Sequence, residues 1–238
     1  MPQTIDLNAD LGEGFPWDQA LLDRVTSASV CCGAHAGDSG TIARTLRWAA
    51  ERGVVVGAHP GYEDREGFGR RDQHLESAKL VASIRMQLRD LGRWAREAGT
   101  TMSFVKPHGA LYNQAQVDPE IASPLLEAVS DPAARPIPIL GQSGGEVERI
   151  ARGLSLPVPF IAEGFADRRY RPDGRLVPRT EPDALLRAPD EIRVQVLWLV
   201  DRGIRTICIH GDDPGSVVLA DLVLATLKGA GIEPRGFA

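Results

Sequence analysis

The chain has 238 residues, of which 43% are hydrophobic and 25% are charged, and its formal net charge is −5. These values are ordinary for a folded globular protein and exclude a collagen-like or disordered chain. An acidic chain without a basic stripe is also not expected to bind nucleic acid, because nothing would neutralise the phosphates.

Short apolar segments alternate with amphipathic segments along the chain. The apolar runs predict strands at 4–7, 28–32, 54–58, 102–106, 137–140, 160–162 and 206–209. The amphipathic runs, several of them bounded by Asp, Ser or Gly, predict helices at 19–26, 41–51, 75–98, 119–130, 145–152, 191–202 and 217–228. Seven strand–helix units of about 34 residues each predict an α/β fold with a mostly parallel sheet. An open sheet and a closed barrel both satisfy this pattern.

The first predicted strand continues into a run in which polar and apolar residues alternate. Asp6, Asn8 and Asp10 are separated by single apolar residues, so a strand would place all three on one face. A solvated edge strand would produce the same pattern. Because this strand opens a buried parallel arrangement, we expect its polar face to line a cavity.

Ionisable residues also follow the ends of most of the other predicted strands. They are His35, His59, Lys106 with His108, Glu163 and His210. Parallel strands end on the same side of a sheet, where α/β proteins carry their sites, so these residues are predicted to meet in one pocket. His74 precedes a helix and is predicted to lie on the surface.

Metal and nucleotide motifs are absent from the sequence. It contains no HExxH motif, no short His/Cys zinc spacing and no GxxxxGK[ST] phosphate loop. Strand-end carboxylates with His35, His59 and His210 could gather around a divalent ion, but no fixed metal site is predicted. Cys31 and Cys32 are adjacent and the third cysteine is distant, which indicates buried, reduced thiols.

Six segments together carry a resemblance to a known family. In chain order they read DLNADLGEG, CCGAHAGD, GAHPGYEDREGFGRR, VKPHGALYN, EGFADRRYRPDGRLVPR and IHGDDPGS. In this order, over about residues 4–234, the sequence resembles the LamB/YcsF family. The resemblance implies a distorted, incomplete, seven-stranded TIM-like barrel of the glycoside hydrolase/deacetylase type, forming one catalytic domain over residues 1–238.

The resemblance also implies an activity, the ATP-dependent opening of 5-oxo-L-proline (pyroglutamate) to L-glutamate. It implies two partner subunits, B and C, which share or handle the ATP. The chain has no secretion signal and no apolar run of about 18 residues, so a cytoplasmic protein is expected. Two alternatives stay open: a metal-dependent deacetylase or amidohydrolase on the same barrel, and a non-catalytic module that binds a lactam.

For the implied reaction, the strand-end residues divide into two sets. The predicted catalytic residues are Asp10, His59, Lys106, His108, Glu163 and His210. The predicted substrate-binding residues are Asp6, Asn8, His35, Arg70, Tyr112, Asp167, Arg168 and Asp212. Asp10 or His59 would serve as the base for water, and Lys106 would stabilise an oxyanion or bind an anion.

Overall fold

Seven parallel strands form a closed barrel in a computed structural model that describes residues 3–130, 136–153, 158–179 and 181–237. The strands are β1 (Thr4–Leu11), β2 (Ser27–Cys31), β3 (Val55–His59), β4 (Met102–Val105), β5 (Ile139–Gly141), β6 (Phe160–Phe165) and β7 (Thr206–Ile209). They pair in chain order from β2 to β7, and β1 closes the ring by pairing with both β7 and β2. This arrangement confirms the seven-stranded barrel and excludes the open sheet.

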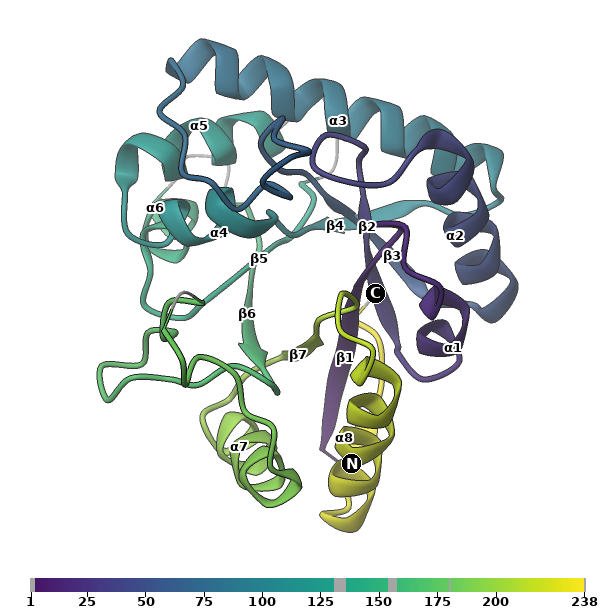
Figure 1. Ribbon diagram of the computed structural model, residues 1–238. Coiled ribbons are helices and arrows are strands. Elements are labelled where there is room, and N and C mark those ends of the chain that lie inside the picture. The colour runs from purple at the N-terminus through teal and green to yellow at the C-terminus, as the bar shows by residue number, and fades with distance from the viewer. Residues whose placement is uncertain (1–2, 131–135, 154–157, 180, 238) are drawn as a thin grey trace.

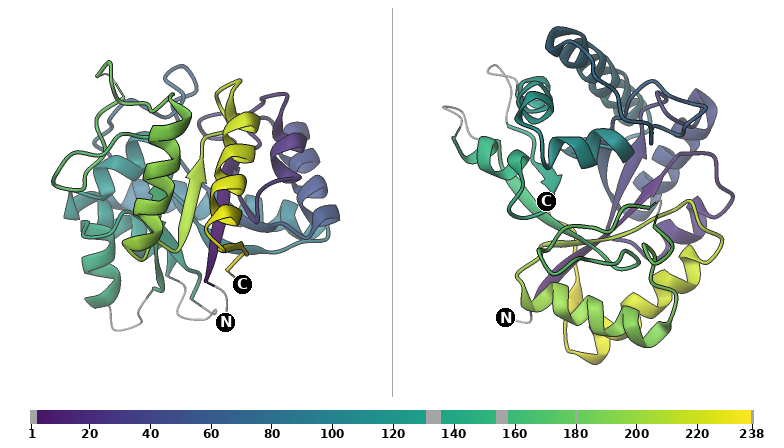
Figure 2. Two further views of the ribbon diagram at one scale, coloured as in Figure 1. Left: turned by 90° about the horizontal axis from the view of Figure 1, so that it is seen from below. Right: turned by 60° about the vertical axis from the view of Figure 1, so that its left-hand side comes forward.

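The helices lie outside the ring of strands (Figure 1). They are α1 (Asp18–Leu22), α2 (Ser39–Arg52), α3 (Ser77–Glu97), α4 (Gly109–Ala115), α5 (Pro119–Val129), α6 (Glu146–Gly153), α7 (Pro189–Asp201) and α8 (Ser216–Gly229). In the left view of Figure 2, α7 and α8 flank the strands on one side of the barrel. No helix in the described part of the chain is long and apolar enough to cross a membrane.

The ends of helix α2 show why the sequence predicts this element well. The Asp38 side chain accepts a hydrogen bond from the Thr41 backbone N–H and caps the first turn. Gly53 ends the helix in the left-handed conformation, with φ of 65°, which glycine adopts without a steric penalty. The helix begins two residues before the predicted start at residue 41 and ends one residue after the predicted end at residue 51.

Two short elements were not predicted. Helix α4 has only seven residues and begins directly after His108, which provides no side-chain cap. Strand β8 (Glu233–Pro234) pairs with β1 at Thr4 and Ile5. Elements this short carry too few residues for a hydrophobic period to be visible. Helix α1 is also shorter than predicted, because it ends at Leu22.

Strand β1 is buried almost throughout, and its two faces differ in chemistry. Leu7, Ala9 and Leu11 belong to the main hydrophobic core. On the alternate face, Asn8 bonds to Glu163 of β6, and Asp10 bonds to Lys106, the residue after β4. The predicted polar face of this strand therefore lines the barrel interior.

Candidate functional site

The side chain of Lys106 lies at the centre of a buried polar cluster inside the barrel. Its Nζ atom lies 2.8 Å from Asp10 Oδ1 and 2.9 Å from Glu163 Oε1. It also donates to Asn8 Oδ1 at 3.2 Å and contacts Cys208 Sγ at 2.9 Å. Strands β1, β6 and β7 and the residue after β4 thus bring these five residues together. We refer to them as the lysine cluster.

Burial affects the charged members of the lysine cluster differently. Burial alone lowers the pKa of Lys106, but the acidic neighbours, Asp10 above all, raise it well above its usual value. Burial alone raises the pKa of Asp10, but His59 and Lys106 lower it below its usual range. For Glu163, burial outweighs Lys106 and raises the pKa. The cluster thus holds a charged ammonium, an ionised Asp10 and a second carboxyl that retains its proton more readily.

Two polar atoms beside Lys106 have no hydrogen-bond partner among the described residues. They are Glu163 Oε2 and the Tyr112 hydroxyl, both fully buried. Tyr112 comes from α4, and burial raises the pKa of its hydroxyl well above the usual value. Buried polar groups are rarely left unpaired unless a ligand or another function uses them. The two atoms are therefore available to a bound molecule.

A second buried group, which we call the histidine cluster, consists of Glu13, His35, His59 and His108. Each residue can offer one ligand atom such that all four atoms lie within 4.8 Å of one another. Burial lowers the pKa of His35 to about 3, that of His108 to about 4 and that of His59 well below its usual value. Burial also raises the pKa of Glu13 to about 7. The cluster contains three uncharged imidazoles around one carboxyl. Their nitrogen lone pairs and the carboxyl oxygens are ligands that suit a divalent ion.

His210 lies close to Asp10 and contacts Asp167. Its Nδ1 atom is 2.9 Å from Asp167 Oδ2, and its ring stacks on that of Phe165. His210 can offer a ligand atom within 4.8 Å of those of Asp10 and Cys208. Although burial alone raises the pKa of Asp167, His210 lowers it below its usual value. Asp167 therefore orients the His210 ring toward the lysine cluster.

Three arginines gather at the mouth of the barrel, and we call them the mouth arginines: Arg70, Arg168 and Arg179. Asp212 pairs with Arg70 and lies 3.5 Å from Arg179. Arg168 is 4% exposed, and burial followed by the charge of Arg179 lowers its pKa to about 10. Its Nε atom has no partner among the described residues. Asp167 also lies close enough to Arg168 and Arg179 for their charges to lower its pKa. Three guanidinium groups beside two carboxylates, Asp167 and Asp212, leave one positive charge for an anion to neutralise.

Asp6 lies away from these groups, toward the amino end of β1. Its Oδ1 accepts from the Thr26 hydroxyl at 2.7 Å, and its Oδ2 accepts from Ser27 at 2.8 Å and from Thr206 at 2.5 Å. All the predicted catalytic residues and most of the predicted binding residues meet at the carboxyl ends of the strands. Asp6 does not join them, and both of its oxygens are already in use.

Several site residues were not predicted from the sequence. Glu13 was visible as the acidic residue just beyond β1, but nothing in its spacing linked it to three distant histidines. Cys208 looks like an ordinary apolar strand residue, and Arg179 lies far along a loop. Their roles arise from the closure of the barrel. The exposed position of His74 confirms its predicted surface placement.

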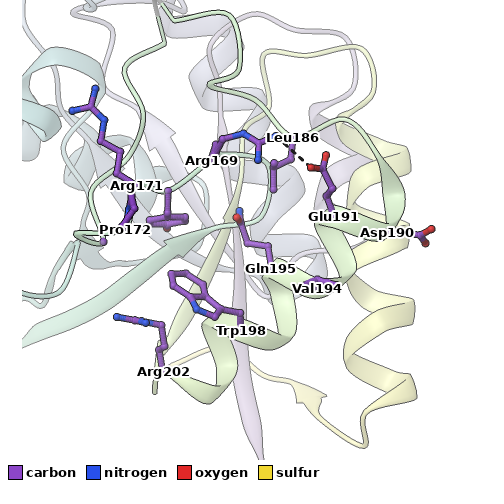
Figure 3. Close-up of a pocket in the computed structure, with 12 residues that line it drawn as sticks. Arg169, Arg171, Pro172, Leu186, Asp190, Glu191, Val194, Gln195, Trp198 and Arg202 are labelled. Carbon is purple, nitrogen blue, oxygen red and sulfur yellow. Dashed lines mark hydrogen bonds and ion pairs between the residues drawn. The ribbon is translucent and has the colours of Figure 1, made fainter.

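A separate pocket of about 740 Å³ lies outside the barrel, between α7 and the loop after β6 (Figure 3). Tyr170 and Trp198 form part of its wall, and Arg169 pairs with Glu191 at 3.3 Å across its rim. None of the lysine or histidine cluster lines it. Because it lacks the convergent ionisable groups of the barrel interior, we place the candidate active site at the two clusters and not in this pocket.

Comparisons with known proteins identify the family of the chain. The LamB/YcsF family matches residues 5–238. The 5-oxoprolinase A subunit of Mycolicibacterium paratuberculosis is 45% identical over 98% of each chain. The crystal structure of the lactam utilization protein from Thermus thermophilus has a TM-score of 0.90 and 34% identity, covering 99% of this chain and 100% of that one.

A more distant structure shares the fold alone. The family 4 carbohydrate esterase from Streptomyces lividans has a TM-score of 0.55 at 13% identity, covering 99% of this chain and 93% of that chain. The barrel, the strand-end clusters and the near full-length matches lead to one conclusion. The chain belongs to the LamB/YcsF family.

Proposed function

We propose that this chain is the A subunit of an ATP-dependent 5-oxoprolinase, a cyclic amide hydrolase that opens 5-oxo-L-proline to L-glutamate. The names of the relatives support the substrate. The observation that carries the chemistry is the pairing of the Lys106 ammonium with a Glu163 carboxyl that has a raised pKa and one unpaired oxygen. A buried cation and a proton donor are the two groups that lactam opening needs.

The lysine cluster matches the charges that develop when a lactam opens. Attack of water on the ATP-activated ring carbon forms a tetrahedral centre with negatively charged oxygen substituents, which the Lys106 ammonium stabilises. Cleavage of the C–N bond leaves a nitrogen that must gain a proton, and Glu163 Oε2 supplies it. The unpaired Tyr112 hydroxyl lies in the same buried region and binds the substrate.

Asp10 accepts the proton of the attacking water. Its Oδ1 is held by Lys106, which leaves Oδ2, 3.5 Å from His59 Nε2, as the acceptor. Although burial alone raises the pKa of Asp10, the charged Lys106 lowers it below its usual range, so Asp10 is ionised at neutral pH and acts without prior deprotonation. His210, oriented by Asp167, lies within reach of the same carboxylate and positions the water or the ring.

The mouth arginines bind the anionic part of the substrate. 5-Oxoproline carries a carboxylate, and an ATP-activated ring would also carry a phosphate. Arg168 has an unpaired Nε, and Arg70 and Arg179 share one carboxylate, Asp212. Guanidinium groups bind either anion through paired hydrogen bonds.

Two partner subunits, B and C, complete the enzyme in this proposal. A lactam resists attack because of amide resonance, and transfer of a phosphoryl group from ATP to its oxygen removes that resistance. Water attack and cleavage of the C–N bond then leave an acyl phosphate of glutamate, and a second water releases phosphate and glutamate. The chain has no P-loop, so we assign ATP chemistry mainly to the partners and ring opening to this chain. Residues 1–238 would act as one catalytic domain that receives the activated ring.

Reconstitution tests this function. The purified chain is mixed with its B and C partners, ATP and 5-oxoproline, and glutamate is measured while each component is omitted in turn. We expect glutamate only from the complete mixture. Glutamate formed at the full rate without this chain would refute the proposal.

One observation favours a second candidate, a metal-dependent amidohydrolase or deacetylase. The histidine cluster offers donors for a divalent ion on a barrel shared with a carbohydrate esterase. Such an enzyme would hydrolyse an amide without partners or ATP, and chelation would stop it. The remaining alternative is a module that binds a lactam without catalysis. It predicts that Asp10→Asn leaves both turnover by the assembly and binding of 5-oxoproline intact.

A further inference from the structure

His59 and His108 face each other through two nitrogen atoms that carry no proton. His59 Nδ1 lies 2.7 Å from the Lys106 carbonyl oxygen, and His108 Nε2 lies 2.8 Å from the Phe68 carbonyl oxygen. A carbonyl oxygen only accepts, so both of these nitrogens must donate. In a neutral imidazole the other nitrogen is then an acceptor. His59 Nε2 and His108 Nδ1 therefore present lone pairs to each other at 3.0 Å.

Glu13 adds a third acceptor at the same point. Its Oε1 atom lies 3.4 Å from His108 Nδ1 and 3.9 Å from His59 Nε2. All three side chains are less than a tenth exposed, so water cannot screen the repulsion between their lone pairs. Three buried acceptors directed at one point require a cation there, which is either a proton or a metal ion.

The spacing of the three atoms fits a tetrahedral metal ion. Ligands at 2.0–2.2 Å from a zinc ion lie about 3.3–3.6 Å apart. The three separations of 3.0, 3.4 and 3.9 Å bracket this value. The two imidazole planes are 88° apart, so both lone pairs can point at a common centre in their own ring planes.

His35 belongs to the same cluster but is not placed to bind the ion. Its ring stacks on that of His108 at 3.7 Å with an angle of 3° between the planes. An ion in the plane of one stacked ring lies well outside the plane of the other. His35 Nε2 is 3.2 Å from Glu13 Oε1, so His35 donates to the carboxylate and positions it.

We propose that Glu13, His59 and His108 bind one divalent transition-metal ion of the zinc type, through Oε1, Nε2 and Nδ1 respectively. In zinc sites with three protein ligands, the fourth ligand is water or substrate. The Lys106 and Phe68 carbonyls fix the two rings in the binding orientation. This site goes beyond the proposed function, because it concerns the isolated chain and needs neither partner subunits nor ATP.

Metal binding by the purified full-length chain tests the site directly. The protein is stripped with a chelator and dialysed against Zn²⁺, and bound metal is measured by mass spectrometry. We expect one Zn²⁺ per chain, a rise in Tm, and the strong visible absorption of low-coordinate Co²⁺ when cobalt replaces zinc. Mg²⁺, which prefers oxygen ligands, should not compete.

Variants separate the ligands from their neighbours. Glu13→Gln and His108→Ala should each weaken Zn²⁺ binding by at least about 100-fold, since loss of an outer partner alone costs about 10–100-fold. His35→Ala should weaken it by about 10–100-fold while the Co²⁺ band keeps its position, because the ligands are unchanged. His74→Ala, which removes an exposed histidine, is the matched control and should bind Zn²⁺ like the wild type.

Three results would contradict the proposed metal site. The first is less than stoichiometric Zn²⁺ in the wild-type chain. The second is unchanged affinity in both ligand variants; circular dichroism confirms their folding, and Glu13→Gln preserves the side-chain shape. The third is a proton held between His59 and His108, seen as an imidazolium nitrogen signal at neutral pH. None of these bears on 5-oxoproline turnover, so the two proposals fail independently.

Discussion

Strand β1 carries two buried aspartates, and their surroundings differ sharply. At the amino end, Asp6 is enclosed by the hydroxyls of Thr26, Ser27 and Thr206, which use both of its oxygens. Four residues later, Asp10 pairs with Lys106, in a cluster whose outer atoms are left without partners among the described residues. The hydrogen bonds of Asp6 are satisfied within the protein. Those of the cluster around Asp10 are satisfied only when a molecule binds.

This difference separates a folding role from a catalytic one on a single strand. Buried polar groups that are fully hydrogen-bonded fix the packing of a core, whereas unpaired groups are stable only where a function requires them. Both aspartates look alike in sequence, since each follows the same alternation. The hydrogen-bond partners, and not the residue type, distinguish them.

Replacing Lys106 should have the largest effect. Lys106→Met leaves Asp10 buried without its cation, which should lower the free energy of unfolding by about 3–5 kcal/mol and abolish activity. Urea unfolding and glutamate formation by the reconstituted assembly measure the two effects. In the double variant with Asp10→Asn, stability should partly return but activity should not. Full activity in Lys106→Met would remove the lysine cluster from the mechanism.

Arg168 should affect binding more than folding. In Arg168→Lys, loss of the planar guanidinium should raise the KM for 5-oxoproline by about 10–100-fold. This is the loss of affinity expected when one charge-assisted hydrogen bond is removed. The kcat should change less, because Arg168 holds the anion and not the reacting amide. Arg175→Lys, on an exposed part of the same loop, is the control. An unchanged KM in Arg168→Lys would refute the anion-binding role of the mouth arginines.

Asp6 should show the opposite behaviour. Asp6→Ala leaves the buried hydroxyls of Ser27 and Thr206 without their acceptor and should cost about 1–3 kcal/mol of stability, measured by urea unfolding. The folded variant should retain the kcat of the wild type. A large fall in kcat without loss of stability would show instead that Asp6 binds substrate.

The stability that Asp6 provides should depend on pH in a defined direction. Burial raises its folded pKa above the ordinary value of 3.8, so the folded state holds the proton more tightly than the unfolded state. The stabilisation that Asp6 provides is fully present below pH 3.8, its ordinary pKa. It is lost as the pH rises through the pKa of Asp6 in the folded state. The stability difference between wild type and Asp6→Ala should therefore shrink as the pH rises through this window. A difference that grows would contradict the raised pKa.

The rim of the outer pocket should matter least. Glu191→Gln breaks an exposed pair with Arg169 and should change the free energy of unfolding by no more than about 0.5 kcal/mol. Thermal unfolding and glutamate formation should both match the wild type. A clear loss of activity would move the functional site toward this pocket.

The sequence predicted more of the fold than of the site. Period-two alternation in β1 and the Asp38 cap of α2 are local signals, and both were readable. Barrel closure could not be predicted from local signals, because alternating strands and helices also suit an open sheet. The family resemblance implied the barrel. The roles of Glu13 and Cys208 depend on contacts between segments far apart in the chain. Nothing local distinguishes such residues from ordinary loop and core positions.

Substitution of Glu163 tests the central claim most directly, because the claim rests on a proton at Glu163 Oε2. Glu163→Gln preserves the shape and an oxygen for Lys106 but removes the acid. With B and C partners, ATP and 5-oxoproline, the variant should form glutamate about 10²–10⁴-fold more slowly than the wild type, at nearly unchanged Tm. Turnover at the wild-type rate by a folded Glu163→Gln variant would contradict the account.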